Sequence, residues 1–189
     1  GGAMPHAMGV TLALAKFNKI VKIDKTSRTA VVQCGVRNLA ISEAAAPLGL
    51  YYAPDPSSQI ACTIGGNVAE NSGGVHCLKY GLTLHNVLKV RGFTVEGEPI
   101  EFGSDALDAP GLDLLPLVVG SEGMLAVTLE VTVKLVPKPK LARCIMASFD
   151  DIRKAGDAVA NVIAAGIIPA GLEMMDKPMT AAVEDYVHA

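Results

Sequence analysis

Glycines, hydroxyls and amides crowd one stretch of the chain, residues 54–74. Its two glycine pairs, Gly65-Gly66 and Gly73-Gly74, allow positive φ angles and let the backbone approach a ligand without a Cβ in the way. Consecutive N–H groups in such turns form a concavity that suits phosphate. Hydrogen-bonding side chains follow at intervals, namely Ser57, Ser58, Thr63, Asn67, Asn71 and Ser72. The pattern predicts a loop that binds a pyrophosphate-bearing cofactor.

Composition alone leaves a second interpretation equally open, a glycine-rich surface loop with tight turns. The stretch matches neither the G-x-G-x-x-G fingerprint of dinucleotide-binding folds nor the G-x-x-x-x-G-K-S/T phosphate loop, so a Rossmann fold is disfavoured. Because residues 61–74 are small and only weakly periodic, we expect a long functional loop there and not a core element.

Two histidines are candidates for acid–base chemistry. Imidazole is the usual general base near neutral pH, which draws attention to His76 and His85. Together with Cys62 and Cys77 they invite a zinc interpretation, but the spacing fits no standard zinc pattern. Ordinary buried or loop cysteines are favoured.

Longer motifs carry a family resemblance. They are Ala53–Gly81, with Thr63-Ile64-Gly65-Gly66-Asn67 at its centre and Tyr80-Gly81 at its end, then Gly120–Leu125, and then Gly171–Asp176. In this order they resemble the FAD-binding domain of the vanillyl-alcohol oxidase type, the PCMH fold. Within that superfamily, residues 51–59 and 73–81 are most similar to the FAD-linked subunits of bacterial glycolate oxidases. The resemblance covers essentially the whole chain.

This resemblance implies where FAD is bound. The backbone amides of Ile64, Gly65 and Gly66 are expected to donate to its pyrophosphate. Attachment through His76 or Cys77 is disfavoured, because the glycolate oxidase type binds its flavin without a covalent link. The implied cofactor-binding residues are Pro54, Asp55, Ser57, Thr63, Ile64, Gly65, Gly66, Asn67, Asn71, Ser72, Gly73, Tyr80, Gly81, Glu122, Gly123 and Val127. Ala126 departs from the family, which usually has glycine there, and its methyl group could crowd a backbone–cofactor contact.

The resemblance also implies a reaction and partners. A D-2-hydroxyacid of the glycolate or D-lactate type is oxidised, with a hydride passing from its α-carbon to FAD while a base removes the hydroxyl proton. Electrons then pass to other glycolate oxidase subunits, one of them an iron–sulfur protein. The family's substrate-binding Arg and its His/Glu residues belong to the C-terminal cap beyond Ala189, so we assign no catalytic and no metal-binding residue.

Local patterns predict an α+β fold. Residues 20–24 and 30–33 flank a turn-like segment and predict a hairpin, and residues 87–93 and 99–102 predict a second one around Glu96-Gly97-Glu98. Apolar residues at helical spacing predict a helix from Val36 to Ala46 that ends before Pro47. A short helix over residues 112–119 and a strand with one buried face over residues 125–136 complete this part.

The segment Pro137-Lys138-Pro139-Lys140 marks the expected domain boundary. Residues 1–137 are expected to form the second subdomain of a PCMH-type FAD-binding domain, without the N-terminal subdomain. Residues 141–189 are expected to begin the FAD-linked oxidase C-terminal cap. There, residues 142–149, 150–165 and 167–175 predict strand, helix and strand, a β-α-β unit followed by a helix near Pro178, with Asp150 or Asp151 as the first helix's cap.

Two further residues and the chain ends complete this interpretation. Glu173 and Asp176 could form a paired-carboxylate site, but structural roles at the cap interface are favoured. The start Gly1-Gly2-Ala3-Met4-Pro5 resembles the middle of a loop, and residues 184–189 stop within a helical pattern. We therefore expect a fragment that is inactive by itself. The alternative is a truncated FAD-fold fragment that acts at most as a nucleotide-binding or assembly module.

Charge and hydropathy exclude some classes of protein. The chain has 16 basic and 19 acidic residues, a net charge of −3, and no basic patch of the kind that nucleic-acid binding needs. Its longest apolar runs, such as Leu114–Val119, are too short to cross a bilayer, and no secretory leader pattern opens the sequence. We expect a cytoplasmic protein whose membrane association is only indirect, through partner subunits.

Overall fold

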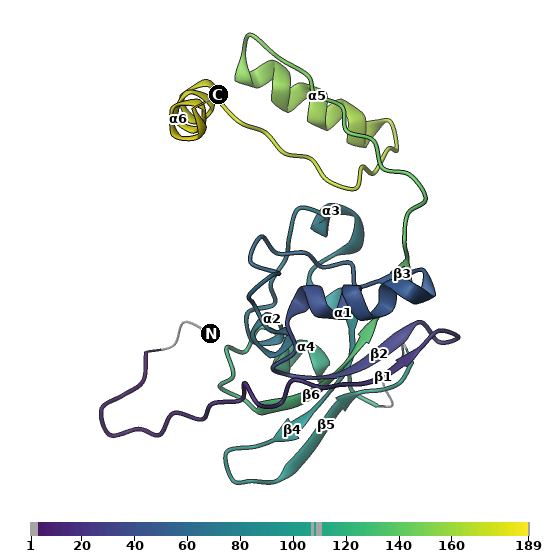
Figure 1. Cartoon of the computed structure of the whole chain (residues 1–189), viewed down its shortest axis with the longest axis vertical. Coiled ribbons are helices and arrows are strands. Elements are labelled where there is room, and N and C mark those ends of the chain that lie inside the picture. Colours follow the sequence, from purple (N-terminus) through teal and green to yellow (C-terminus); the bar gives the residue numbers. More distant parts are fainter. Residues whose placement is uncertain (1–3, 107, 109–110, 189) are drawn as a thin grey trace.

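The computed structural model describes residues 4–106, 108 and 111–188. A body of sheet and helices contains the chain up to Pro137, and a helical C-terminal part is joined to it by an extended connection (Figure 1). The N-terminal segment, purple in the figure, is extended and projects from the body before it enters the sheet.

The body is built on a five-stranded antiparallel sheet. Its strands lie in the order β1 (Ile20–Asp24), β2 (Thr29–Gln33), β6 (Val127–Lys134), β4 (Val87–Phe93) and β5 (Pro99–Gly103). The outer pairs β1–β2 and β4–β5 are the two predicted hairpins, and both predictions are confirmed. Strand β6 lies between the hairpins and pairs with β2 on one edge and β4 on the other.

The long strand predicted over residues 125–136 is correct in kind but differs in detail. β6 ends at Lys134, and a separate short strand, β7 (Val136–Pro137), pairs with β3 (Leu50–Tyr51). The prediction of one buried face is wrong in the middle of β6, where Val131, Thr132 and Val133 are all buried. A central strand has neighbours along both edges, and their side chains shield even its outward-facing residues.

The hydrophobic core lies between this sheet and the helices packed on one of its faces. Val32, Val90 and Val131 from the sheet and Ile41 from α1 (Asn38–Ala45) are fully buried. Burying one such side chain stabilises the fold by roughly 1.5–3 kcal/mol relative to exposing it. Figure 1 shows α1, α2 (Ile64–Glu70) and α4 (Leu115–Val118) on this side of the sheet.

The helix predicted before Pro47 is confirmed, with a short extension. α1 begins after Arg37, and a 3₁₀ turn, η1 (Ala46–Leu48), continues it through the proline. Proline is tolerated there because the first turn of a helix needs no N–H from it. The chain then reverses at Gly49, whose φ of +72° is a conformation that glycine adopts without strain, and enters β3.

The loop predicted over residues 61–74 is wrong in its central part. The α-helix α2 occupies that part, and its residues Ile64 and Val68 are fully buried in the core. The two glycines in the first turn removed the apolar periodicity that would have predicted a helix. Contacts from elsewhere in the chain stabilise α2 instead, as its capping bonds show below.

Short turns connect the remaining elements of the body. α3 (Cys77–Tyr80) and η2 (Thr83–Asn86) lie between α2 and β4. The helix predicted over residues 112–119 is confirmed only as the single turn α4, because Leu112 and Leu114 stay outside the core and remain exposed.

The C-terminal part contains helices but neither predicted strand. α5 (Ile152–Ala164) and α6 (Lys177–Val187) form, and Asp151 caps α5 as predicted, accepting from Arg153 N at 2.8 Å. Residues 142–149 and 167–175 are irregular, so the predicted β-α-β unit is wrong in both strands. A strand is stable only when its backbone groups are paired, and two strands alone would be marginal even if they paired with each other.

The described helices also bear on membrane insertion. Across residues 4–106, 108 and 111–188, none is both long enough and apolar enough to span a bilayer.

Candidate cofactor site

The N-terminus of α2 lies at the centre of the predicted cofactor loop. Thr63 is its N-cap, and the Thr63 Oγ1 accepts from Gly66 N at 3.3 Å. Ile64 N donates to Val36 O and Gly65 N donates to Cys34 O, each at 2.8 Å. These three amides were the expected pyrophosphate donors. Each already has an acceptor within the chain, so the donor role of these amides stays a prediction.

Gly65 is required here by packing against the protein itself. A Cβ at this position would lie 2.8 Å from Cys34 Cβ and 2.9 Å from Cys34 O, closer than side-chain carbons approach. The absence of a side chain therefore lets α2 begin directly against the end of β2. This explains one of the two glycines without invoking a ligand.

Two buried asparagines connect α2 to the segment at residues 53–59. Asn67 Nδ2 donates to Asn38 Oδ1 at 2.8 Å, and Asn38 Nδ2 donates to Pro54 O at 2.8 Å. Asn67 was predicted to contact the cofactor, but it is 3% exposed and its amide faces Asn38. Its role in the structure is to fix the position of Pro54, another predicted residue.

The C-terminus of α2 brings together further predicted residues. Asn71 ends the helix at φ +48°, and its Oδ1 accepts from Leu84 N at 3.0 Å. Ser72 O accepts from Thr83 Oγ1 at 2.8 Å. Glu122 N donates to Ala69 O at 2.8 Å, which brings the predicted pair Glu122 and Gly123 beside the same helix end, while Val127 opens β6.

A hollow of about 630 Å³ lies beside these elements. This volume falls within the usual range of small-molecule sites. Three segments form its wall, and three of the lining residues, Asp55, Ser57 and Gly73, were predicted to bind the cofactor. The complete lining is Asp55, Pro56, Ser57, Gln59, Gly73, Gly74, Val75, Cys77 and Glu173. The structure therefore unites part of the predicted site and places the α2 residues outside the hollow's lining.

Backbone packing at Gly74 sets the shape of this hollow. A Cβ at Gly74 would lie 2.3 Å from Asp55 O and 2.4 Å from Asp55 C, so only glycine fits. The two segments of the wall consequently meet backbone to backbone.

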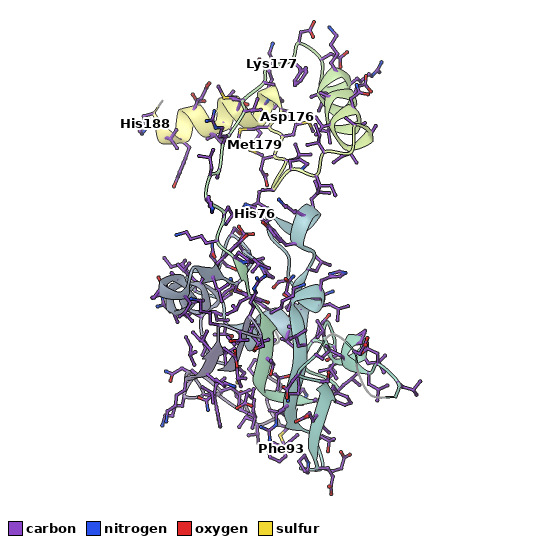
Figure 2. The ribbon with its side chains drawn as sticks, turned by 90° about the vertical axis from the view of Figure 1, so that its right-hand side faces the viewer. His76, Phe93, Asp176, Lys177, Met179 and His188 are labelled. Carbon is purple, nitrogen blue, oxygen red and sulfur yellow. The ribbon has the colours of Figure 1, made fainter. Side chains whose placement is uncertain are left out.

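Asp55 and His76 form a hydrogen-bonded pair at the edge of the hollow. His76 Nδ1 lies 2.5 Å from Asp55 Oδ2, and His76 N lies 3.4 Å from Asp55 Oδ1. The Asp55 side chain is 18% exposed and that of His76 is 40% exposed. Figure 2 shows His76 at the junction of the body and the C-terminal part. The sequence drew attention to His76, but no spacing signal predicted its contact with Asp55.

Tyr80 and Gly81 lie behind this pair. The Tyr80 ring is 6.4 Å from the His76 ring and meets the Tyr51 ring edge-on at 6.2 Å. Burial, followed by the nearby Tyr80 and Asp55, raises the pKa of Tyr51. Gly81 has φ +77° and packs against the imidazole of His85. Both residues support the wall from outside, since neither lines the hollow.

The C-terminal part contributes Glu173 and Asp176 in different ways. Glu173 lines the hollow together with residues of the body. Asp176 instead caps α6, because its Oδ1 accepts a hydrogen bond from Met179 N at 2.9 Å. Both residues are labelled in Figure 2. A structural role for Asp176 is therefore confirmed, as the N-cap of α6, while Glu173 is a wall residue of the candidate site.

These observations favour the hollow over the N-terminus of α2 as the place where a polar, extended cofactor binds. Backbone atoms of Gly73 and Gly74, a hydroxyl at Ser57 and a carboxylate at Asp55 line the hollow. Such groups suit the hydroxyls and linking groups of a dinucleotide. The N-terminus of α2 fits less well, because its first amides already have acceptors within the protein.

Comparison with known families identifies the class. Residues 1–103 match the family described as "FAD binding domain", and residues 138–189 match the family "FAD linked oxidases, C-terminal domain". The chain therefore belongs to the FAD binding domain family, and FAD is its cofactor.

Particular relatives are similar over the whole chain. The glycolate oxidase subunit GlcD of Escherichia coli K12 is 65% identical over 189 residues, covering 100% of this chain and 38% of that protein. GlcD of Bacillus subtilis is 44% identical, covering 98% and 40%. A D-lactate dehydrogenase of Anaerostipes hadrus is 33% identical, covering 99% and 39%. The resemblance to glycolate oxidase subunits is confirmed, and the chain spans about two fifths of the length of these relatives.

Solved structures support the fold. An alkyldihydroxyacetonephosphate synthase matches with a TM-score of 0.70 at 22% identity, covering 92% of this chain and 34% of that chain. At this identity the match concerns the fold alone. Together with the family matches, it confirms a mixed α and β fold with an FAD-binding domain and the beginning of the oxidase C-terminal domain.

Proposed function

We propose that this chain supplies part of the FAD-binding domain of an oxidoreductase that oxidises a D-2-hydroxyacid of the glycolate or D-lactate type. The observation that carries the proposal is the 65% identity to the E. coli glycolate oxidase subunit along all 189 residues. The D-lactate dehydrogenase similarity at 33% identity supports the same substrate class.

The chain's own contribution is to bind and orient the cofactor. FAD, when bound, accepts the hydride that leaves the substrate α-carbon. We assign Asp55, Ser57 and Gly73 to the cofactor wall, and the other predicted residues to the support of that wall. Asn67 acts through Asn38 and Pro54, and Tyr80 acts through His76. Catalytic residues for the hydroxyl proton are not assigned to this chain.

The proposal extends to organisation and partners. We place the FAD-binding domain at residues 1–137 and the start of the C-terminal cap at residues 141–189, a division supported by the proline-rich connection and by the family match that begins at residue 138. Because the relatives are named as subunits, we infer other subunits, one of them an iron–sulfur protein that takes the electrons. We assign a cytoplasmic location, with membrane contact only through these partners.

We further propose that the 189-residue chain by itself binds FAD weakly and does not turn over substrate. The wall of the hollow comes from only three segments, and the apolar residues Ile145, Met146 and Ile168 of the C-terminal part are exposed. Each charge-assisted hydrogen bond that a cofactor lacks costs about 1.5–3 kcal/mol, or at least about tenfold in affinity.

A chimera tests the proposal directly. The matching segment of E. coli GlcD is replaced by these 189 residues, and the purified protein is examined for flavin absorbance and for dye reduction with glycolate and D-lactate. We expect bound FAD near one per chain and activity with at least one of the two acids. A folded chimera without flavin would contradict the cofactor role, and a flavin-containing one without activity would contradict the proposal that these residues orient the cofactor for oxidation of a 2-hydroxyacid.

The isolated chain provides the comparison. It is titrated with FAD by fluorescence and assayed with the same dyes and acids. We expect weaker FAD binding than in the chimera and no turnover. Tight binding together with turnover would show that the 189 residues are sufficient for the reaction.

A further inference from the structure

Two segments that are distant in sequence line the hollow side by side. Segment 53–59 supplies Asp55 and Ser57, and segment 72–77 supplies Gly73 and Cys77. In the described part of the chain, both hydrogen bonds between these segments run between His76 and Asp55. The hydrogen bonding between the two segments therefore depends on one pair of residues.

The pair makes contact at two points. One carboxylate oxygen of Asp55 meets the His76 ring at 2.5 Å, and the other meets the His76 backbone N–H at 3.4 Å. A two-point contact fixes both the position and the rotation of the carboxylate. Behind it, Gly74 packs against the backbone of Asp55, so the pair and the glycine hold the same junction.

The imidazole is itself supported by its neighbours. Its ring lies 6.4 Å from the Tyr80 ring, which meets Tyr51 edge-on at 6.2 Å, within the range of favourable aromatic packing. On the other side of the segment, Gly171 packs so closely on Val75 that a Cβ there would lie 2.9 Å from Val75 Cγ2. The segment that carries His76 therefore also supports the C-terminal residues that bring Glu173 to the hollow.

We propose that Asp55 and His76 form a latch that sets the width of the cofactor hollow, with His76 as a positioning residue for the Asp55 segment. This inference rests on the proposed function for the identity of the ligand, which is FAD. The latch requires the Asp55 carboxylate to accept a hydrogen bond from Nδ1–H of His76, so that Nδ1 carries a proton.

The tautomers of two histidines test the latch without any cofactor. His85 provides an internal contrast, because its Nδ1 accepts from Leu82 N at 3.0 Å and its proton must lie on Nε2. With only four histidines in the chain, the His76 signals can be assigned by their loss in His76→Asn. Nitrogen-15 NMR of the 189-residue chain at about pH 8.5, where imidazoles are neutral, is expected to show opposite tautomers at the two sites. A proton on Nε2 of His76 would overturn the latch.

Three substitutions test its effect on the cofactor, in the chimera described above. In His76→Asn the amide nitrogen takes the place of Nδ1, whereas in His76→Gln it takes the place of Nε2. We expect His76→Ala and His76→Gln to raise the FAD dissociation constant about tenfold or more, and His76→Asn to stay within about threefold. Circular dichroism of each variant checks that the fold is retained.

The outcomes separate the two proposals. Unchanged FAD affinity in His76→Ala, or equal losses in His76→Asn and His76→Ala, would overturn the positioning role. A chimera that binds no FAD even with His76 present counts against the proposed function. The tautomer measurement then still decides the latch, because it uses the chain without cofactor.

Discussion

Asn67 and Asn38 are 29 residues apart in sequence, yet the side-chain amide of Asn67 donates to Oδ1 of Asn38 across 2.8 Å inside the core. Their exposed fractions are 3% and 1%. The Nδ2 of Asn38 in turn donates to Pro54 O, and Pro54 precedes Asp55 and Ser57 in the chain. A buried polar pair thus connects α2, α1 and one wall of the hollow.

Asn67→Ala is expected to lower the free energy of unfolding by about 1–3 kcal/mol, because it leaves a buried oxygen of Asn38 without this donor. Urea unfolding followed by circular dichroism measures the change. Asn18→Ala is the matched control, since Asn18 is exposed and should cost little. Equal effects of the two substitutions would contradict a role for the buried pair.

Two glycine-to-alanine substitutions should change stability in opposite directions. Gly65→Ala places a methyl group 2.8 Å from Cys34 Cβ, and we expect a loss of about 1–3 kcal/mol of stability from this overpacking. Gly156 lies inside α5 with no atom near its Cβ position, so Gly156→Ala should stabilise that helix by about 0.5–1 kcal/mol.

Each of these two substitutions is followed by a measurement that reports on its own part of the structure. The unfolding midpoint of the body reports on Gly65→Ala, and amide hydrogen exchange within α5 reports on Gly156→Ala. Exchange in α5 is expected to slow by about two- to fivefold. An unchanged unfolding midpoint in Gly65→Ala would mean that α2 can move away from Cys34 without cost.

Local sequence predicted those parts of the fold whose stability is local. The two hairpins were predictable because alternating apolar residues flank short turns in each. α2 was not, because its helical state depends on Val36 O and Cys34 O, which satisfy its first amides from about thirty residues away. The strands expected over residues 142–149 and 167–175 lacked any partner that would pair their backbone groups.

The same division applies to the candidate site. Glycine pairs and hydroxyls indicated a cofactor segment, and Asp55, Ser57 and Gly73 do line the hollow. The contact between Asp55 and His76, 21 residues apart, has no periodicity that would reveal it. The donor role of Ile64, Gly65 and Gly66 was inferred from motif resemblance, which says nothing of the acceptors already present in the chain.

The β1–β2 turn should contribute to the pH dependence of stability. Backbone hydrogen bonds from Ser27 and Thr26, together with Lys22, hold the pKa of Asp24 below its ordinary value of 3.8. Because the folded state has the lower pKa, the contribution of Asp24 is fully present above about pH 4 and is lost as the pH falls through the lower, folded-state pKa.

Asp24→Ala is therefore expected to be less stable than the unsubstituted chain at pH 7, with the difference shrinking below about pH 4. Thermal unfolding of both proteins between neutral and acid pH measures it. Lys25→Ala, in the same turn, is a control that leaves the hydrogen bonds of Asp24 in place. A difference that stays constant across this pH range would contradict the ionised carboxylate as its source.

Gly74→Ala is expected to affect cofactor binding more than folding. Its Cβ would lie 2.3 Å from Asp55 O, so the segment that carries Asp55 and Ser57 must move away from the segment that carries Gly74. In the chimera we expect the FAD dissociation constant to rise at least about tenfold, since a displaced wall loses hydrogen bonds worth about 1.5–3 kcal/mol each.

Gly49→Ala is the matched control, because Gly49 has φ +72° and open space around it, so alanine there strains the backbone without touching the hollow. FAD fluorescence titration of both variants, alongside their unfolding midpoints, separates the two effects. A Gly74→Ala protein that keeps its affinity for FAD while Gly49→Ala loses it would remove this hollow from the cofactor site.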